Sequence, residues 1–217
     1  MNHTPQPPPD NTPGVAGGEP YPLTFDVVYP DRELNRVSSA FRIFAAIPIV
    51  AVLVALGGGG WERFGEAAVG IVFLPALLMI LFRQKYPRWW FDWNRELLRF
   101  SNRVSAYLAL LSDRYPSTDE QQYVALELDY PDAALDLNRW LPLVKWLLAI
   151  PHYVVLLFLY LGSVLAVIAA WFSILVTGRY PRGLFDFVVG VMRWQNRVVA
   201  YAFVLITDRY PPFRLAP

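Results

Sequence analysis

Residues 180–210 read YPRGLFDFVVGVMRWQNRVVAYAFVLITDRY, and residues 86–115 read YPRWWFDWNRELLRFSNRVSAYLALLSDRY. The two stretches share Tyr-Pro-Arg, Phe-Asp, Arg, Asn-Arg-Val and Ala-Tyr at a constant spacing of 94 residues, and both end in Asp-Arg-Tyr. This repetition predicts a tandem duplication. Each stretch is also predicted to form a helix that begins after Tyr-Pro and is stopped by the proline of Asp-Arg-Tyr-Pro.

Each predicted helix carries a polar stripe among aromatic and aliphatic residues. The stripes consist of Asp92, Arg95, Glu96, Arg99, Asn102, Arg103 and Ala106 in the first copy, and of Arg182, Asp186, Gly190, Arg193, Asn196, Arg197 and Ala200 in the second. Spacings of three and four residues place side chains on one helix face, as in a helix lying at a membrane surface. Crossing the bilayer would instead place Arg193 and Arg197 near its middle, at about 2.5–3.5 kcal/mol each. We therefore expect interfacial helices.

The composition indicates a membrane protein. Apolar residues make up 55% of the 217 residues, above the roughly 45–50% of soluble domains. The 19 basic and 18 acidic residues nearly cancel, so no overall charge favours nucleic acid as a partner. Cysteine is absent, which excludes disulfides, thiolate metal sites and cysteine nucleophiles. The proline-rich residues 1–20 are predicted to be a disordered tail.

Two segments show the alternation of apolar and polar residues that is typical of strands. They are Leu23–Tyr29 and Val124–Tyr130, and both continue into Tyr-Pro-Asp. We expect the two strands to pair across the repeat axis. A ribbon of only two strands is marginally stable, so it would need support from the helices or from another subunit.

Long apolar segments follow both strands. In the first copy, residues 40–56 and 67–82 are separated by Gly57–Gly60 and a small charged loop. In the second copy, Trp140–Thr177 would form a helix of about 57 Å, too long for a bilayer core of about 30 Å. It is predicted to turn back at Gly162-Ser163. Of the basic residues only Arg63 would lie between spanning helices, so the positive-inside rule predicts cytoplasmic termini.

The predicted fold is an all-α membrane protein with four transmembrane helices and a minor two-stranded β element. Each repeat would contain a short strand, a transmembrane helical hairpin and an interfacial amphipathic helix. The predicted divisions are residues 1–20 as the tail, 21–116 as the first repeat, 123–211 as the second repeat, and 212–217 as a C-terminal tail.

The duplicated unit, with Tyr-Pro before the helix, Asn-Arg-Val within it and Asp-Arg-Tyr-Pro after it, resembles the bacterial integral-membrane family catalogued as domain of unknown function 4389. The resemblance extends from Leu23 to Pro211 in two copies. Single-copy members imply that such proteins could dimerise into the arrangement that this chain builds covalently. The resemblance implies a multi-pass protein of the cytoplasmic membrane and no particular activity.

Few residues are suited to catalysis or metal binding. His152 lies in an apolar segment, where an ionisable group can mark an ion path. We interpret it as a neutral imidazole bonded to a backbone carbonyl, because its counterpart in the first copy is Ile49. With two histidines, no cysteine and no carboxylate in a predicted spanning segment, we expect no catalytic residue, no metal site and no cofactor.

The remaining candidate site consists of the repeated polar residues Arg99, Asn102 and Arg103 with Arg193, Asn196 and Arg197. Their guanidinium groups could bind anionic lipid headgroups. Alternatively, they could pair with carboxylates of the helices and strands or cap backbone carbonyls. The sequence leaves both interpretations open.

The function predicted is that of a non-enzymatic integral membrane protein that organises or senses the cytoplasmic leaflet, or serves as an accessory subunit of a membrane complex. Its expected partners are membrane lipids, anionic ones among them, and a membrane protein or further copies of itself. The alternative is a small transporter or channel with a path between the two hairpins. The scarcity of polar residues in the predicted spanning segments argues against that alternative.

Overall fold

A two-stranded antiparallel ribbon joins the two halves of the chain. In the computed structural model, which describes residues 21–30, 33–56, 66–117 and 123–217, the strands are β1 (Leu23–Val27) and β2 (Val124–Leu128), with Phe25 opposite Leu126. The apolar residues of both strands are buried, whereas the alternate residues are exposed. The predicted strands and their pairing are therefore confirmed.

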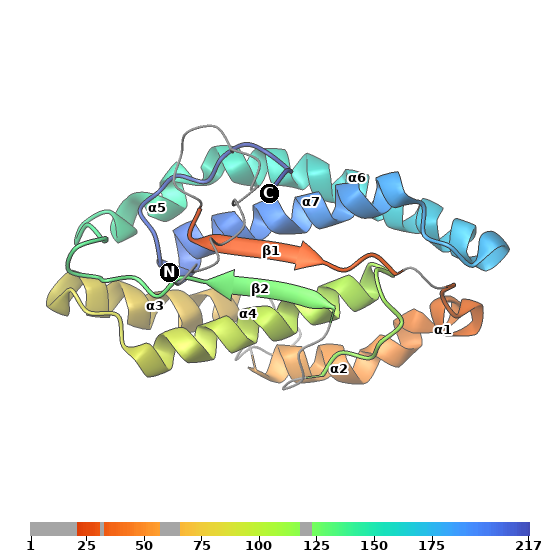
Figure 1. Ribbon diagram of the computed structural model, residues 1–217. Coiled ribbons are helices and arrows are strands. Elements are labelled where there is room, and N and C mark those ends of the chain that lie inside the picture. The colour runs from red at the N-terminus through yellow and green to blue at the C-terminus, as the bar shows by residue number, and fades with distance from the viewer. Residues whose placement is uncertain (1–20, 31–32, 57–65, 118–122) are drawn as a thin grey trace, which may run out of the picture.

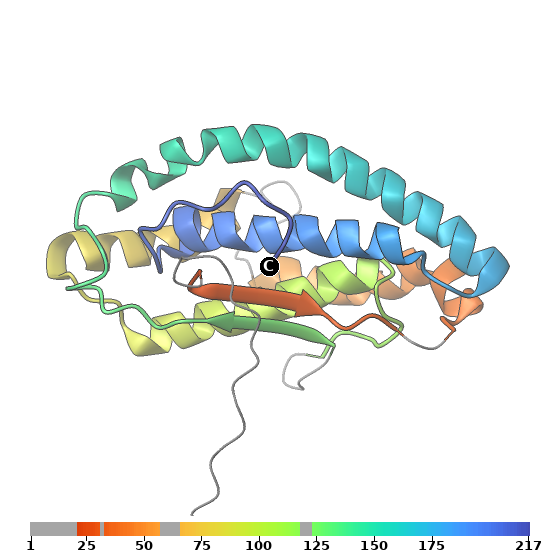
Figure 2. The same cartoon turned by 45° about the horizontal axis from the view of Figure 1, so that its top comes forward.

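Helices form two further layers behind the ribbon (Figures 1 and 2). The middle layer consists of α4 (Arg88–Leu108) and α7 (Arg182–Val199), which continues as a π-helical turn, Ala200–Val204. The far layer, on the side away from the ribbon, consists of α2 (Arg42–Leu56), α3 (Glu66–Arg83), α5 (Pro142–Leu148) and α6 (Ile150–Thr177). The short helix α1 (Arg36–Ala40) precedes α2, and Asn35 caps its N-terminus with a side-chain oxygen. All long elements run roughly along one axis of the molecule.

The second half does not contain the predicted hairpin. Helix α6 runs unbroken through Gly162 and Ser163 for 28 residues. Ala149 separates it from α5, and the two helices follow one another along one arc (Figure 2). Pro151 lies in the first turn of α6. Backbone N–H groups in the first turn have no acceptor within the helix, so the N–H that proline lacks costs no helical hydrogen bond. The expected turn was wrong because a glycine followed by a serine is tolerated within an apolar helix.

The first half is not folded as a helical hairpin in the described residues either. Helices α2 and α3 follow one another along the same edge of the molecule. Helix α2 packs on α4, whereas α3 packs on Ala200–Val204 and α5. The arrangement of α2 and α3 matches that of the single helix α6, so four transmembrane helices are not supported.

The middle-layer helices begin where predicted but end earlier. Pro87 and Pro181 cap α4 and α7 at their N-termini. Past their C-terminal ends the backbone turns at Leu110 and Leu205, both buried and both left-handed, with φ of 63° and 62°. The helices thus end before these leucines, several residues before the prolines that were expected to stop them.

Helix α7 is not a surface helix. Eleven of its residues are buried, because the ribbon covers one side of it and α6 the other. Its apolar residues extend around most of the helix, whereas α4 keeps Trp89 and Trp93 exposed. The expectation of two equivalent interfacial helices is therefore wrong for α7. The predicted tail 1–20 and the Gly57–Gly60 turn lie outside the described residues.

Candidate functional site

A pair of buried asparagines lies between α4 and α7. Asn102 donates to Asn196 Oδ1 at 2.8 Å, and Asn196 donates back to Asn102 Oδ1 at 2.7 Å. The second amide hydrogen of each goes to a carbonyl one turn earlier in its own helix, Leu98 and Met192. Both amides are therefore satisfied in a region without water access, which fixes the register of one helix against the other.

One turn away from the asparagines, two arginines hold the ribbon. Arg193 Nε donates to Phe25 O at 2.9 Å and its Nη2 to Asp26. Arg99 Nε donates to Leu126 O at 2.9 Å and its Nη2 to Glu127. Phe25 and Leu126 face each other in the register, and their carbonyls point to the outer edges of the ribbon. Each arginine therefore satisfies an edge that would otherwise be open to pairing with another strand.

Arg103 and Arg197 bind the segments that follow the two helices. Arg103 Nη1 donates to Ser117 O at 2.9 Å, and Arg197 donates to Arg214 O and Ala216 O. Burial, together with the nearby Arg214 and Arg193, lowers the pKa of Arg197 to about 10. Its guanidinium group stays charged at neutral pH, so the backbone carbonyls of the C-terminal tail act as its hydrogen-bond acceptors.

Further repeated residues tie each half together internally. Arg42 bonds the carbonyls of Tyr107 and Ser112 and pairs with Asp113. The corresponding contacts in the second half are those of Lys145, which bonds Thr207 O at 2.7 Å and pairs with Asp208 at 2.7 Å. The aspartate of Asp-Arg-Tyr-Pro therefore neutralises the buried basic residue of its own half.

Two tyrosine hydroxyls form a matching pair of contacts across the halves. Tyr29 donates to Tyr180 O, and Tyr130 donates to Tyr86 O. The guanidinium group of Arg182 lies over the ring of Tyr29, and that of Arg88 over the ring of Tyr130, each at 5.0 Å. In both cases a tyrosine that follows the strand of one half contacts the start of the middle-layer helix of the other half.

His152 is fully buried in an aromatic cluster. Its Nδ1 accepts a hydrogen bond from the indole of Trp194 at 3.0 Å, and its ring stacks on Phe213 at 4.0 Å between centroids. The partner is thus an indole instead of the expected backbone carbonyl. Accepting at Nδ1 requires that this nitrogen carry no hydrogen, which agrees with a neutral imidazole.

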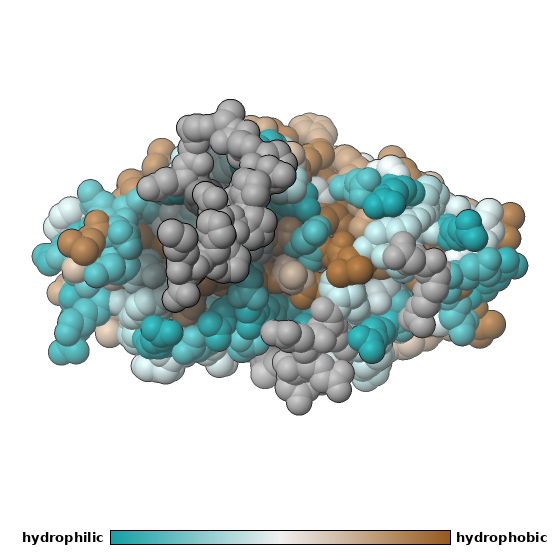
Figure 3. Space-filling view, viewed as in Figure 1, coloured by the Kyte–Doolittle hydropathy of each residue, from teal (hydrophilic) through white to brown (hydrophobic). Residues whose placement is uncertain are grey.

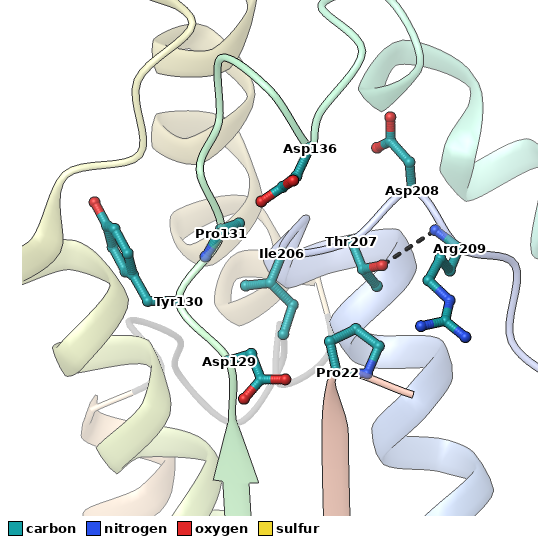
Figure 4. A pocket seen from close by; sticks show the side chains of 9 residues that line it. All are labelled: Pro22, Asp129, Tyr130, Pro131, Asp136, Ile206, Thr207, Asp208 and Arg209. Atoms are coloured by element: carbon teal, nitrogen blue, oxygen red, sulfur yellow. Dashed lines mark hydrogen bonds between the residues drawn. The ribbon is translucent and has the colours of Figure 1, made fainter. Parts of the chain in front are cut away.

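A shallow cavity of about 690 Å³ lies where β2 ends and the segment after α7 begins (Figure 4). Its lining includes the carboxylates Asp129, Asp136 and Asp208. Asp136 accepts from Asp132 N, and Asp208 accepts from Asn138 N and pairs with Lys145. Two of the three carboxylates therefore accept hydrogen bonds from backbone amides. The described residues contain no cluster of His, Cys, Asp or Glu able to hold a metal ion.

The largest unexplained feature is the apolar surface of the far layer. Helix α6 buries only a narrow stripe, and large apolar residues cover the rest of it, among them Phe158, Leu165 and Val176 at 67%, 68% and 76% exposure. Helix α2 exposes Ile43 and Phe44 in the same way. The ribbon side is mainly hydrophilic, and hydrophobic residues gather along the edge formed by α6 (Figure 3). Among the described residues, α6 alone is long and apolar enough to cross a membrane.

These features define a helical protein with one hydrophilic side and an apolar layer opposite. A family model described as "Domain of unknown function (DUF4389)" matches residues 140–214, the second half of the chain. The first half, where a second copy was expected, lies outside the match. No curated protein and no solved structure matches the chain.

All six predicted site residues lie in one band along α4 and α7, but their polar groups face internal partners. Lipid binding by these residues stays a prediction, and the contacts favour the structural alternative. The sequence analysis assigned no role to Arg42 or Lys145. Their recurrence with Asp113 and Asp208 was the available signal, because a buried base requires a buried acid.

Proposed function

We propose that this chain is a non-enzymatic membrane protein that organises or senses the cytoplasmic leaflet, on its own or as an accessory subunit of a membrane complex. The observation that carries the proposal is the apolar surface of α2, α3, α5 and α6. Soluble monomers rarely expose contiguous apolar patches larger than a few hundred Å². An apolar layer this extensive favours contact with acyl chains.

We also propose that the chain is a tandem duplication with both termini on the cytoplasmic side. The paired contacts of Asn102 with Asn196, of Arg99 and Arg193 with opposite strands, and of Tyr29 and Tyr130 with opposite helices support a two-fold plan. The same residue types make the same contacts in both halves. Unrelated segments would have no reason to match in this way.

The transport alternative receives no support from these contacts. A path on the axis between the halves would pass the asparagine pair, where the two amides bond each other. The buried cations nearby are bonded to backbone carbonyls and carboxylates. The asparagine pair therefore stands in the way of a solute path along the described part of this axis.

Membrane extraction and flux measurements test the proposal. The full-length chain should stay with the membrane fraction after washing with alkaline carbonate and high salt. Reconstituted liposomes should show no ion or small-solute flux above protein-free liposomes. Release of the protein by the washes would reject membrane residence, whereas robust protein-dependent flux would favour a transporter.

A further inference from the structure

We infer that the molecule lies flat in one leaflet, with the axis of α6 parallel to the membrane plane and the ribbon facing water. The surface concerned consists of the outward faces of α2, α3, α5 and α6, and its occupant is the acyl-chain region of a single leaflet. The inference rests on the proposed membrane residence and specifies how the apolar layer meets the bilayer.

The layered arrangement opposes a crossing orientation of α6. Helix α7 packs along α6, with Phe187 against Gly162 near the middle of α6. Arg193 lies about 9 Å further along α7, and it pairs with Asp26, whose side chain is 76% exposed. If α6 crossed the membrane centrally, Asp26 would lie within the hydrocarbon half-thickness of about 15 Å.

Glu127 would face the same problem, because its side chain is 67% exposed on the same polar face of the ribbon. Charged groups exposed to lipid at this depth are strongly disfavoured. With the molecule lying flat, the ribbon is instead the layer furthest from the acyl chains. Both carboxylates then face water.

Basic residues at both ends of α6 support the flat orientation. Arg139 precedes the α5–α6 segment, and Arg179 and Arg182 follow it. The sequence-based topology had all of these residues on one side of the membrane, but this depended on the expected turn at Gly162. The helix is unbroken, so a crossing α6 would put one basic end outside the cell. A flat α6 keeps both ends at the same leaflet.

Helix lengths agree with this orientation. Helix α6, with 28 residues, is about 42 Å long, well above the roughly 30 Å of bilayer hydrocarbon. Helix α2 has 15 residues and, at about 22 Å, is too short to cross. Yet the two helices belong to one layer. Two helices of such different lengths can lie at the same depth in the membrane along their whole length only if their axes are parallel to the membrane plane.

Spin labels on single cysteines test the inference, since the chain contains no natural cysteine. Val154, Leu165 and Val176 are all exposed, and their spacing of nearly whole helical turns places them on one face of α6. Labels at Val154→Cys, Leu165→Cys and Val176→Cys in phospholipid vesicles should report equal depth by oxygen and nickel-chelate accessibility. Thr24→Cys on the ribbon is the aqueous reference.

A crossing helix would give a different profile, with Leu165→Cys deepest and the other two about 16 Å shallower. That profile would overturn the inference while leaving membrane residence intact. Low oxygen accessibility at all three sites, with spin–spin coupling between chains, would assign the face to a second copy and also overturn it. Failure of the protein to enter vesicles would instead reject the proposed function.

Labelling in intact cells gives an independent measurement. Leu135→Cys lies before α5–α6 and Arg179→Cys after it, and both positions are exposed. An impermeant thiol reagent should label neither site until the cells are opened. Labelling of one site alone would demonstrate crossing and overturn the inferred flat orientation. Labelling of both sites would agree with a flat orientation but place it in the outer leaflet, which would reject the cytoplasmic side given in the proposed function.

Discussion

At the residue scale, the polar groups at the centre of the molecule act as mutual partners. Asn102 and Asn196 exchange hydrogen bonds, and each flanking arginine bonds a strand carbonyl. A buried polar group that loses its hydrogen-bond partner costs free energy, because it has no water to replace that partner. A single substitution here should therefore lower the free energy of unfolding by more than the net contribution of one hydrogen bond, because it leaves the partner group buried without an acceptor or donor.

Asn102→Leu should lower stability in detergent by about 1–3 kcal/mol, since it leaves the Asn196 amide without its buried partner. The double variant Asn102→Leu/Asn196→Leu removes both polar groups and should be closer to wild type than either single variant. Thermal unfolding followed by circular dichroism measures all three. Additive losses in the double variant would show that the two amides are not coupled.

Arg193→Gln should loosen the ribbon, because it removes the charged donors to Phe25 O and Asp26. A loss of about 1.5–3 kcal/mol is typical of such bonds. Asp26→Asn is the matched control, since it removes only an exposed ion pair worth about 0–1 kcal/mol. Hydrogen exchange measures the effect, and the strand amides should exchange faster in Arg193→Gln than in Asp26→Asn. Retained strand protection with selective loss of copurifying anionic lipid would instead support headgroup binding by Arg193.

Because Tyr123 is partly buried, we expect the free energy of unfolding to fall at alkaline pH. Burial raises its pKa to about 12 from an ordinary value of 10, so the folded state favours the neutral phenol. This contribution is complete below pH 10 and is lost between pH 10 and 12, up to roughly 2–3 kcal/mol. Tyr123→Phe should flatten the pH dependence of unfolding in that interval, because phenylalanine has no hydroxyl that can lose a proton. An unchanged slope would contradict this prediction.

At the element scale, the C-terminal tail behaves as part of the fold. Arg214, Leu215 and Ala216 supply carbonyls to Arg193 and Arg197, and Leu215 lies so close to Gly190 that an added Cβ would be 2.9 Å from the Leu215 side chain. The segment 212–217, predicted as a C-terminal tail, is therefore packed along α7. The close approach requires glycine at this position of the helix.

Deletion of residues 212–217 should lower the unfolding midpoint, because Arg197 loses its acceptors while most of its side chain stays enclosed. The expected loss is about 1–3 kcal/mol. Adding Arg197→Leu to the truncated chain should recover part of it. Differential scanning fluorimetry of the full chain, the truncation and the combined variant tests this. An additional loss on adding Arg197→Leu would indicate that the arginine has found other acceptors.

Elements with strong local patterns were predictable, and their partners were not. The alternation of apolar and polar residues predicted the two strands, and the Tyr-Pro-Arg sequences predicted where α4 and α7 begin. The unbroken α6 could not be read from sequence, because Gly162 is compatible with both a turn and a helix. The six polar residues were placed on the correct helices, but their acceptors are mainly backbone carbonyls such as Phe25 O and Ala216 O. Any residue type supplies a backbone carbonyl, so the sequence carries no signal for these contacts.

At the scale of the whole molecule, polar and apolar residues are separated into opposite layers. The ribbon presents Thr24, Asp26 and Glu127 on one side, and α6 presents Phe158 and Leu165 away from it. The middle layer is joined to both by buried contacts. Such a molecule can satisfy water and hydrocarbon at once only by lying at their boundary, in the manner of interfacial proteins.

One-sided insertion predicts an effect on membrane shape. A flat apolar layer adds area to the leaflet it enters and none to the opposite leaflet, which favours curvature toward the inserted side. Adding the protein in detergent to preformed anionic liposomes, so that it enters from outside, should reduce their mean diameter as the protein-to-lipid ratio rises. Electron cryomicroscopy measures the diameters. Leu165→Asp should weaken the effect by opposing burial of α6, whereas the ribbon variant Thr24→Asp should leave it unchanged. Equal shrinkage with wild-type and Leu165→Asp protein would mean that insertion of this face is not the cause.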